Sequence, residues 1–186
     1  MTALVDGWLQ GVAHVPSPNV DDRPAGSRVE LVVIHNISLP PGAYGGGLVR
    51  ALFTNSLDPR AHPFFADLGG IRVSAHLLVE RDGTVTQFAS FERRAWHAGA
   101  SEFRGRQRCN DFSVGIELEG TDFEPFTDAQ YEALNRTLHA LFAAYPVAAV
   151  CGHSDIASDR KTDPGPCFEW RRLLLPASVT LPFARV

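Results

Sequence analysis

Apolar residues run almost unbroken from Val29 to Ile34 (VELVVI), a pattern typical of a central β-strand that is covered on both faces. The polar pair His35-Asn36 follows this strand directly. A second apolar run, Val147 to Cys151, leads in the same way into Gly152-His153. Polar side chains at the ends of buried strands indicate a functional site rather than more core.

Two further stretches have the period of a β-strand. Residues 113–119 alternate, which puts Val114, Ile116 and Leu118 on one face and leaves Glu117 and Glu119 on the other. Residues 72–79 and 84–88 flank the turn sequence Arg-Asp-Gly at 81–83 and predict a hairpin.

Helical spacing appears in three places. Residues 48–53 predict a short helix, and Thr127 with Gln130 forms a capping box that opens a longer helix ending before Pro146. Residues 168–175, with Pro166 near their start, predict a last helix. The loop-rich part, residues 39–70, is expected to form an ordered wall beside a cleft, because long loops in compact domains are usually functional.

The length of 186 residues suits one domain, because a chain of this size buries roughly 70% of its unfolded surface. We expect a single domain over 1–186, with an N-terminal arm over 1–26 and a C-terminal tail over 176–186. The net charge of −4 argues against a basic nucleic-acid binder. The longest uncharged stretch, residues 140–152, is too short to span a bilayer, so no membrane partner is expected.

The cysteines and the first residues bear on the compartment. Cys109, Cys151 and Cys167 are odd in number and form no CxxC pair, which favours free thiols in a reducing environment. The opening segment, MTALVDGWLQ, has neither a basic region nor an apolar core of the kind found in export signals. We therefore expect a cytoplasmic protein.

The histidines carry the candidate chemistry. His35, His153 and Asp163 offer two imidazoles and a carboxylate, and a catalytic zinc site needs three such ligands and an open fourth position. Spacing alone leaves an alternative open, in which the three are hydrogen-bonded structural residues. His76 is expected to be a buried, hydrogen-bonded core residue. His97 is expected to line the cleft. The other three histidines are expected to be structural or exposed: His14, His62 and His139.

Five colinear segments carry a resemblance to a known family: VVIHNISLPPG, RVSAHLLVERDG, RAWHAG, RCNDFSVGIELEG and GHSDIASDRKTDPGP. Together they resemble the zinc amidases of the N-acetylmuramoyl-L-alanine amidase type. Among these amidases, the resemblance is strongest to the branch that acts on anhydromuropeptides. It extends over about residues 7–175. The resemblance implies an α+β fold with a central mixed β-sheet flanked by helices. It also implies one Zn²⁺ ion, held by His35, His153 and Asp163.

Further residue roles follow from the same resemblance. Glu117 is expected to act as the catalytic acid/base and Lys161 to stabilise the transition state. Residues expected to contact the substrate are Asn36, Arg72, Arg108, Ala157, Phe64 and His97. Phe64 stands where the family often has an aromatic residue with a hydroxyl, and Ser158 stands where it often has proline, which leaves substrate detail open.

Elementary chemistry agrees with these roles. A carboxylate on the non-core face of its strand, Glu117, can accept a proton from water and pass it to a leaving amine. Lys161, close in sequence to Asp163, can direct a cation at an oxyanion. Arg72 and Arg108 offer the bidentate geometry that suits carboxylates.

The expected reaction is hydrolysis of the amide between the lactyl group of (1,6-anhydro-)N-acetylmuramic acid and L-alanine, in cytoplasmic peptidoglycan recycling. The partner would be a small muropeptide, the protein a monomer, and muropeptide levels would indirectly control β-lactamase induction in hosts that have such a circuit. A non-catalytic recognition module on the same fold would lack a metal ligand. An exported or phage lytic amidase would carry an export signal, a wall-binding module or a basic surface.

Overall fold

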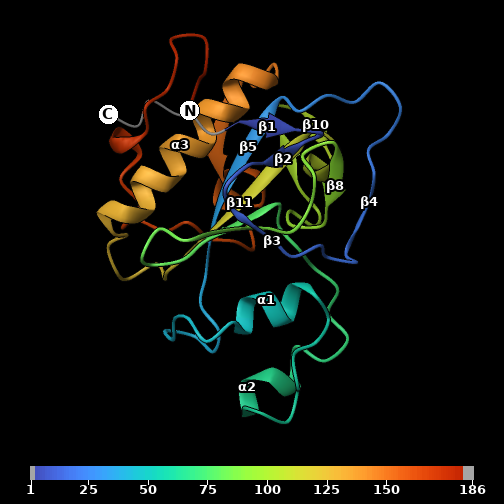
Figure 1. The fold of residues 1–186 in the computed structure, drawn as a ribbon, viewed down its shortest axis with the longest axis vertical. Helices are drawn as coiled ribbons and strands as arrows, with labels where there is room; N and C mark the ends of the chain where they lie inside the picture. The colour runs from blue at the N-terminus through green and yellow to red at the C-terminus, as the bar shows by residue number, and fades with distance from the viewer. Residues whose placement is uncertain (1–2, 182–186) are drawn as a thin grey trace.

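The computed structural model describes residues 3–181. Its centre is a mixed six-stranded sheet with the strand order β12-β5-β11-β6-β7-β3 (Figure 1). The strands of this sheet are β3 (Ala13–His14), β5 (Leu31–Ile37), β6 (Leu77–Val79), β7 (Val85–Gln87), β11 (Ser113–Glu119) and β12 (Ala149–Gly152). The expectation of a central mixed sheet is confirmed.

Strands β12, β5, β11 and β6 run parallel, and β6 and β7 form the predicted antiparallel hairpin. The register places His35 beside Glu117 on neighbouring strands β5 and β11. The apolar run alone predicts a strand that ends before His35. In the structure β5 extends to Ile37, so His35 lies within the strand. The added pairing with β11 continues the strand through these polar residues.

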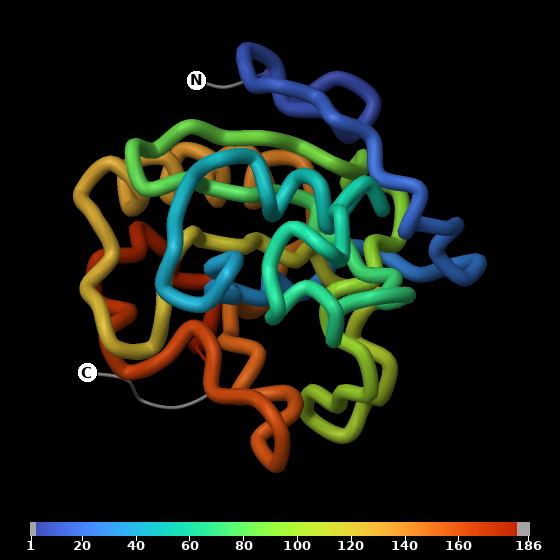
Figure 2. Tube along the Cα trace, turned by 90° about the horizontal axis from the view of Figure 1, so that it is seen from below, coloured from blue at the N-terminus to red at the C-terminus, as the bar shows by residue number. Residues whose placement is uncertain are grey.

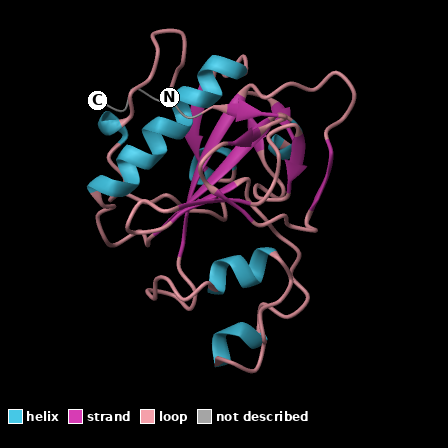
Figure 3. Cartoon of the chain, in the orientation of Figure 1, coloured by secondary structure: helices cyan, strands magenta, loops and turns pink. Residues whose placement is uncertain are grey.

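Helix α3 (Asp128–Ala144) covers one face of the sheet (Figure 3). The capping box predicted at Thr127 and Gln130 is present at its start. The side chains of Val114, Ile116 and Leu118 point to this face and join the largest apolar cluster with the buried side of α3. Burial of this stripe, at about 25 cal/mol per Å² of apolar surface, stabilises the packing of α3 on the sheet.

The opposite face carries shorter elements. Helices α1 (Leu48–Phe53) and α2 (Pro63–Ala66) pack over a second apolar cluster that includes Leu78 of β6. Figure 2 shows this segment in front of the sheet when the molecule is seen from below. The prediction of a helix at 48–53 is confirmed, and α2 adds one helical turn to a stretch expected to be loop.

A third apolar cluster lies on the same face, towards the other edge of the sheet. It joins Leu31, Val33 and Cys151 to Ala98 and to Ile156 of α4 (His153–Ile156). The segment around 98–112 contains β9 (Glu102–Phe103), β10 (Arg106–Gln107) and the 3₁₀ turn η1 (Cys109–Asp111), and β9 lies against α4.

The N-terminal segment, expected to be an arm, forms short strands and pairs with the rest of the chain. It contains β1 (Leu4–Val5), β2 (Trp8–Leu9) and β4 (Val20–Asp22), and β4 pairs with β8 (Arg93–Ala95). The guanidinium of Arg23 donates hydrogen bonds to the carbonyl oxygens of Phe91, Asn110, Asp111 and Ser113. These long-range bonds tie the segment to the loops around the sheet.

The predicted helix over 168–175 is wrong. Only a 3₁₀ turn, η2 (Trp170–Arg172), forms there. The rings of Phe168 and Trp170 pack edge to face, 4.8 Å apart, and both are buried in the cluster under α3. The backbone N–H of Glu169 donates to the hydroxyl of Tyr131 at 2.7 Å. These contacts with α3 hold the segment in an irregular path. Residues 182–186 of the expected tail lie outside the described residues.

Candidate metal centre and active-site pocket

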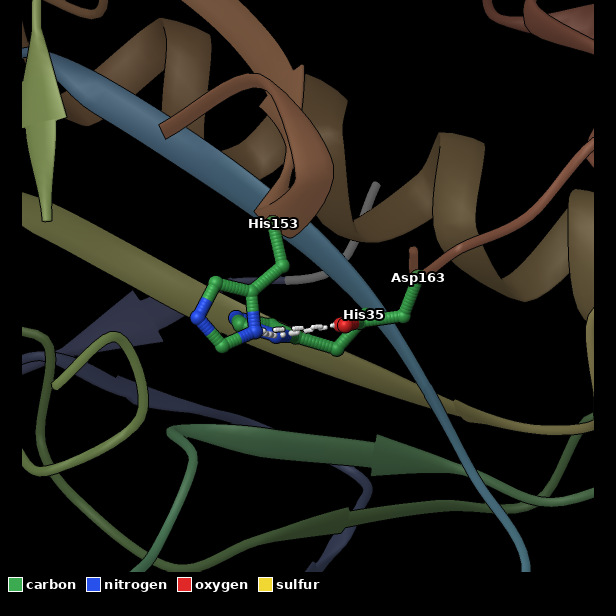
Figure 4. A group of neighbouring side chains, drawn as sticks. All are labelled: His35, His153 and Asp163. Carbon is green, nitrogen blue, oxygen red and sulfur yellow. Dashed lines mark hydrogen bonds and ion pairs between the residues drawn. The ribbon is translucent and has the colours of Figure 1, made fainter. Parts of the chain in front are cut away.

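Three side chains converge near the C-terminal end of strand β5. The Nδ1 atoms of His35 and His153 are 3.1 Å apart, and Oδ2 of Asp163 lies 3.0 Å from the first and 3.2 Å from the second. Figure 4 shows the two rings and the carboxylate pointing at one another from three different segments. Both histidines are buried and Asp163 is nearly so. The structure thus brings together the three ligands that the sequence singles out.

The chain geometry explains why these groups meet. His35 stands near the end of β5, and His153 opens α4 immediately after β12, which is paired with β5. Gly152 permits the loop that carries Asp163 to approach, because a Cβ at this position would lie 2.7 Å from the ring of Pro164. The amide of Asn36 donates to the carboxylate of Asp122 at 2.7 Å and to the carbonyl oxygen of Pro164 at 3.1 Å. Asn36 therefore fastens the Asp163 loop to the end of β5.

The arrangement fits a zinc ion. Ligand atoms bound tetrahedrally at the usual Zn–N and Zn–O distances lie about 3.3 Å from one another, close to the 3.0–3.2 Å found here. Nε2 of His153 lies 3.1 Å from the carbonyl oxygen of Ala98. This oxygen can only accept a hydrogen bond, so Nε2 carries the proton and donates, which leaves a lone pair on Nδ1. A lone pair that faces a carboxylate oxygen is favourable only with a cation between them, so the donor set suits a metal.

The protonation states follow from burial and charge. Burial lowers the pKa of His35 to about 4, although the neighbouring Asp163 acts to raise it. Burial acts to raise the pKa of Asp163, but its close contacts with the imidazoles of His153 and His35 outweigh burial and hold that pKa well below its usual range. A neutral imidazole and an ionised carboxylate are the forms that bind metal ions.

Glu117 and Lys161 face the same pocket, which has a volume of about 230 Å³ and is also lined by His35, His153 and Asp163. Oε2 of Glu117 is buried and has no hydrogen-bond partner among the described residues. Burial, with the charge of Asp163 second, raises the pKa of Glu117 well above its usual range, and the charge of Lys161 opposes the shift. A carboxyl group in this state can hold a proton near neutral pH.

The predicted substrate residues fall into three groups. His97 and Asn36 line the pocket beside the ligands. Arg108 and Ala157 line a separate pocket of about 380 Å³ between the 100–108 segment and α4. Arg72 and Phe64 are exposed on the α1–α2 side and are not among the residues that line the pocket at the ligands.

A larger pocket of about 650 Å³ adjoins the ligands. It shares Asn36, Lys161 and Asp163 with the smaller one and is further bounded by Asp122 and by the exposed ring of Phe123. Its wall is formed partly by residues 38–42, at the start of the segment expected to border a cleft.

The other histidines lie away from the ligands. His76 is fully buried; its Nδ1 accepts from the N–H of Gly115 and its Nε2 lies 3.0 Å from the carbonyl oxygen of Arg93, which confirms the expected core role. His62 caps α2 through Nδ1. His14 and His139 are exposed, as expected.

The sequence analysis did not predict a role for several residues around the candidate ligands. Ala98, Asn110 and Ser113 contact the histidines or their neighbours through long-range hydrogen bonds. The motifs RAWHAG and RCNDFS contain them, but only the fold reveals what their polar atoms contact.

Comparison with known proteins places the chain in a family. Residues 25–166 match the family model described as N-acetylmuramoyl-L-alanine amidase. The chain is 57% identical over 171 residues to the 1,6-anhydro-N-acetylmuramyl-L-alanine amidase AmpD of Escherichia coli, an alignment that covers 91% of this chain and 93% of that protein.

Two solved structures extend the comparison. A crystal structure of a selenomethionine AmpD derivative superposes with a TM-score of 0.90 at 54% identity, covering 91% of this chain and 96% of that one. The amidase AmiD from E. coli, in complex with the substrate anhydro-N-acetylmuramic acid-L-Ala-D-γ-Glu-L-Lys, superposes with a TM-score of 0.57 at 29% identity, covering 83% and 64% of the two chains.

Proposed function

Because the chain belongs to the N-acetylmuramoyl-L-alanine amidase family and is an amide hydrolase, we propose that it is zinc-dependent and cleaves the amide between the lactyl group of 1,6-anhydro-N-acetylmuramic acid and L-alanine. The observation that supports zinc most directly is the convergence of two imidazole Nδ1 atoms and one carboxylate oxygen within 3.0–3.2 Å of one another. The names of the relatives support the substrate class.

In this proposal His35, His153 and Asp163 hold the metal. Zinc bound by two neutral ligands and one anion keeps a positive charge and supplies Lewis acidity, which polarises a carbonyl oxygen and lowers the pKa of water. All three ligands come from segments fixed by the sheet or by hydrogen bonds, so the chain holds them in place before substrate arrives.

Glu117 moves the proton. Its carboxylate lies in the pocket with the ligands and has one oxygen without a partner among the described residues, so it can accept a proton from the attacking water. Its raised pKa lets it retain that proton until the alanine nitrogen leaves. Lys161 lines both adjoining pockets and offers a cation to the oxygen of the amide as negative charge develops.

Substrate binding divides between the pockets in this proposal. The 650 Å³ pocket beside Asn36 and Lys161 is large enough for a sugar or several peptide atoms, and Arg160 adds a cation to its wall. Arg108 and Ala157, in the pocket near α4, remain predicted contacts of the muramic acid, as does Arg72. Phe64 and His97 remain predicted substrate contacts. An anionic muropeptide needs a few such placed cations rather than a basic surface.

The proposed setting is cytoplasmic peptidoglycan recycling by a monomeric enzyme. No helix within residues 3–181 is both long and apolar enough to cross a membrane. In a host with a muropeptide-responsive circuit, loss of this activity would raise β-lactamase expression. Unchanged expression after deletion, in a host where anhydromuropeptides do accumulate, would contradict this last point.

The test is the variant Glu117→Gln. We expect it to bind one zinc ion with the wild-type affinity, because Glu117 is not among the ligands, and to lose at least about 100-fold in kcat, the usual scale of a general acid/base. Zinc content is measured by metal analysis, and kcat on anhydromuramyl-L-alanyl peptide by chromatography. Full activity in this variant would remove Glu117 from the mechanism.

A second variant, Asp163→Asn, serves as the contrast. It keeps the shape of the side chain but removes the anionic ligand, so both zinc affinity and activity should fall together. Retention of zinc at wild-type affinity in Asp163→Asn would contradict the proposed ligand set.

A further inference from the structure

One short segment, residues 97–98, lies behind both imidazoles of the proposed metal site. From its contacts we infer that His97, supported by Ser113, Gly115 and Asn110, is a positioning residue that orients His35, while the adjoining carbonyl of Ala98 orients His153. The inference rests on the proposed zinc site. It states that one dipeptide, residues 97–98, orients two of the three proposed ligands.

The contact with His35 is direct. Nε2 of His35 lies 2.9 Å from Nδ1 of His97, and the two rings meet edge to face with centroids 5.0 Å apart. When Nδ1 of His35 presents its lone pair to a metal, Nε2 carries the ring proton. Nδ1 of His97 is then the acceptor of that proton, which fixes both the tautomer and the orientation of the His35 ring.

The second nitrogen of His97 completes the chain of hydrogen bonds. Nε2 of His97 lies 3.1 Å from the hydroxyl of Ser113. If Nδ1 of His97 accepts from His35, Nε2 must carry the proton and donate to Ser113. The hydroxyl of Ser113, on β11, can take this role, so every ring nitrogen in the chain has a partner of the right kind.

Gly115 makes room for the His97 ring. It lies on the same face of β11 as Ser113 and Glu117, between them. A Cβ built on Gly115 would lie 2.4–2.7 Å from three atoms of the His97 ring, closer than any real contact. The ring therefore rests on the bare backbone of β11, which places Nδ1 within reach of His35.

The Ala98 carbonyl supports the other imidazole. Nε2 of His153 lies 3.1 Å from this oxygen, which also accepts from the guanidinium of Arg160 at 2.7 Å. Oδ1 of Asn110 accepts from the backbone N–H groups of both His97 and Ala98, at 3.2 and 2.8 Å. One amide side chain thus holds the dipeptide that contacts both ligands.

The test compares His97→Phe with His97→Asn. Phenylalanine keeps a ring but has no acceptor, whereas asparagine can offer Oδ1 near the position of the lost Nδ1. We expect His97→Phe to weaken zinc binding about 10- to 100-fold, the usual effect of removing a partner of a metal-ligating histidine. His97→Asn should recover most of that loss. The dissociation constant is measured by competition with a chromophoric chelator, which does not depend on turnover.

A second readout reports the tautomer of His35. In the zinc-loaded wild-type protein, the ¹⁵N spectrum of the imidazoles should show a proton on Nε2 of His35 that is protected from exchange. That protection should be lost in His97→Phe and kept in His97→Asn. A merely structural role of His97 would not separate the two variants in this way.

His76→Phe is the matched control. His76 is also buried beside β11 and bonds to the backbone at Gly115 and Arg93. Its ring meets the His97 ring edge to face, with centroids 5.8 Å apart, a contact that phenylalanine can keep, and it contacts neither proposed ligand. We expect this variant to lower the free energy of unfolding of the metal-free protein while its folded fraction binds zinc within about twofold of wild type. An equal loss of zinc affinity in His76→Phe and His97→Phe would overturn the inference, because it would indicate general damage.

Two further outcomes separate failure of the His97 inference from failure of the zinc proposal. Wild-type zinc affinity in His97→Phe, or equal losses in the Phe and Asn variants, would overturn the role of His97 and leave the zinc proposal standing. Failure of the wild-type protein to bind zinc would overturn the zinc proposal itself, and the inference with it.

Discussion

Glu117 and Glu119 stand two residues apart on one face of β11, yet their surroundings are opposite. Glu119 is buried and its carboxylate accepts from the backbone N–H groups of Gly45, at 2.7 Å, and Arg81, at 3.3 Å. Glu117 has an oxygen without a partner among the described residues. Glu119 therefore holds loops together, and Glu117 is kept available for chemistry at a cost in stability.

That cost gives a prediction for the metal-free protein. Because the pKa of Glu117 is raised in the folded state, the folded protein binds more protons than the unfolded one above pH 4.5. Its stability therefore falls as pH rises through the window between the unfolded and the folded pKa. Glu117→Gln removes this penalty and should raise the free energy of unfolding at pH 7.

Denaturant unfolding with a chelator present, at pH 4 and pH 7, measures the effect. The difference between Glu117→Gln and wild type should be present at pH 7 and shrink towards zero at pH 4, where Glu117 is mostly neutral in both states. The control Glu119→Gln should have the opposite sign and lower stability by about 1 kcal/mol, because it weakens two hydrogen bonds to backbone N–H groups. Equal destabilisation by both variants would contradict the assignment.

The sequence could predict that both glutamates share a face, because strand alternation is a local property. It could not distinguish them, because the partners of Glu119 come from Gly45 and Arg81, far away in the chain. The same holds for His97, whose motif suggested a place in the cleft but not its bond to His35.

At the scale of elements, strand β11 provides different support on each face. Its apolar side chains pack under α3. On the other face Ser113 and Gly115 lie against His97, and Glu117 lines the pocket at the proposed ligands. Gly115 is an ordinary strand position without a positive φ, so alanine would normally stabilise it by about 0.5–1 kcal/mol.

The prediction for Gly115→Ala is the reverse. Its Cβ would overlap the His97 ring, so stability should fall by about 1–3 kcal/mol and zinc affinity should fall as the ring shifts. In a His97→Ala background the overlap is absent, and Gly115→Ala should become neutral or stabilising. Chelator competition and thermal unfolding of the four proteins form a double-mutant cycle. Independent, additive effects would contradict the packing of His97 on β11.

Helix prediction succeeded where the pattern was long and capped, and failed where tertiary contacts dominate. Helix α3 was predicted with its capping box because both signals lie within its own sequence. The segment 168–175 has helical spacing, but the packing of Phe168 and the bond from Glu169 to Tyr131 give it only a 3₁₀ turn. The pairing of the short edge strand β3 with β7 was likewise absent from any local pattern.

At the scale of the molecule, the two faces of the sheet have separate tasks. The longest helix and the largest apolar cluster cover one face, and the proposed ligands, Glu117 and the adjoining pockets lie on the other. The mixed sheet was predictable from strand patterns and from the family resemblance. The position of α1 and α2 in front of the sheet was not, because it depends on packing over Leu78 and Phe88.

The most direct test of the central claim is the identity of the products. Purified protein is stripped with a chelator, reloaded with zinc, and incubated with 1,6-anhydro-N-acetylmuramyl-L-Ala-D-γ-Glu peptide, and the products are analysed by mass spectrometry. We predict no cleavage without metal, and with zinc the release of intact peptide with a free alanine amine together with the free anhydro sugar acid. Cleavage in the stripped protein at the zinc-loaded rate, or cleavage at any other bond, would contradict the account.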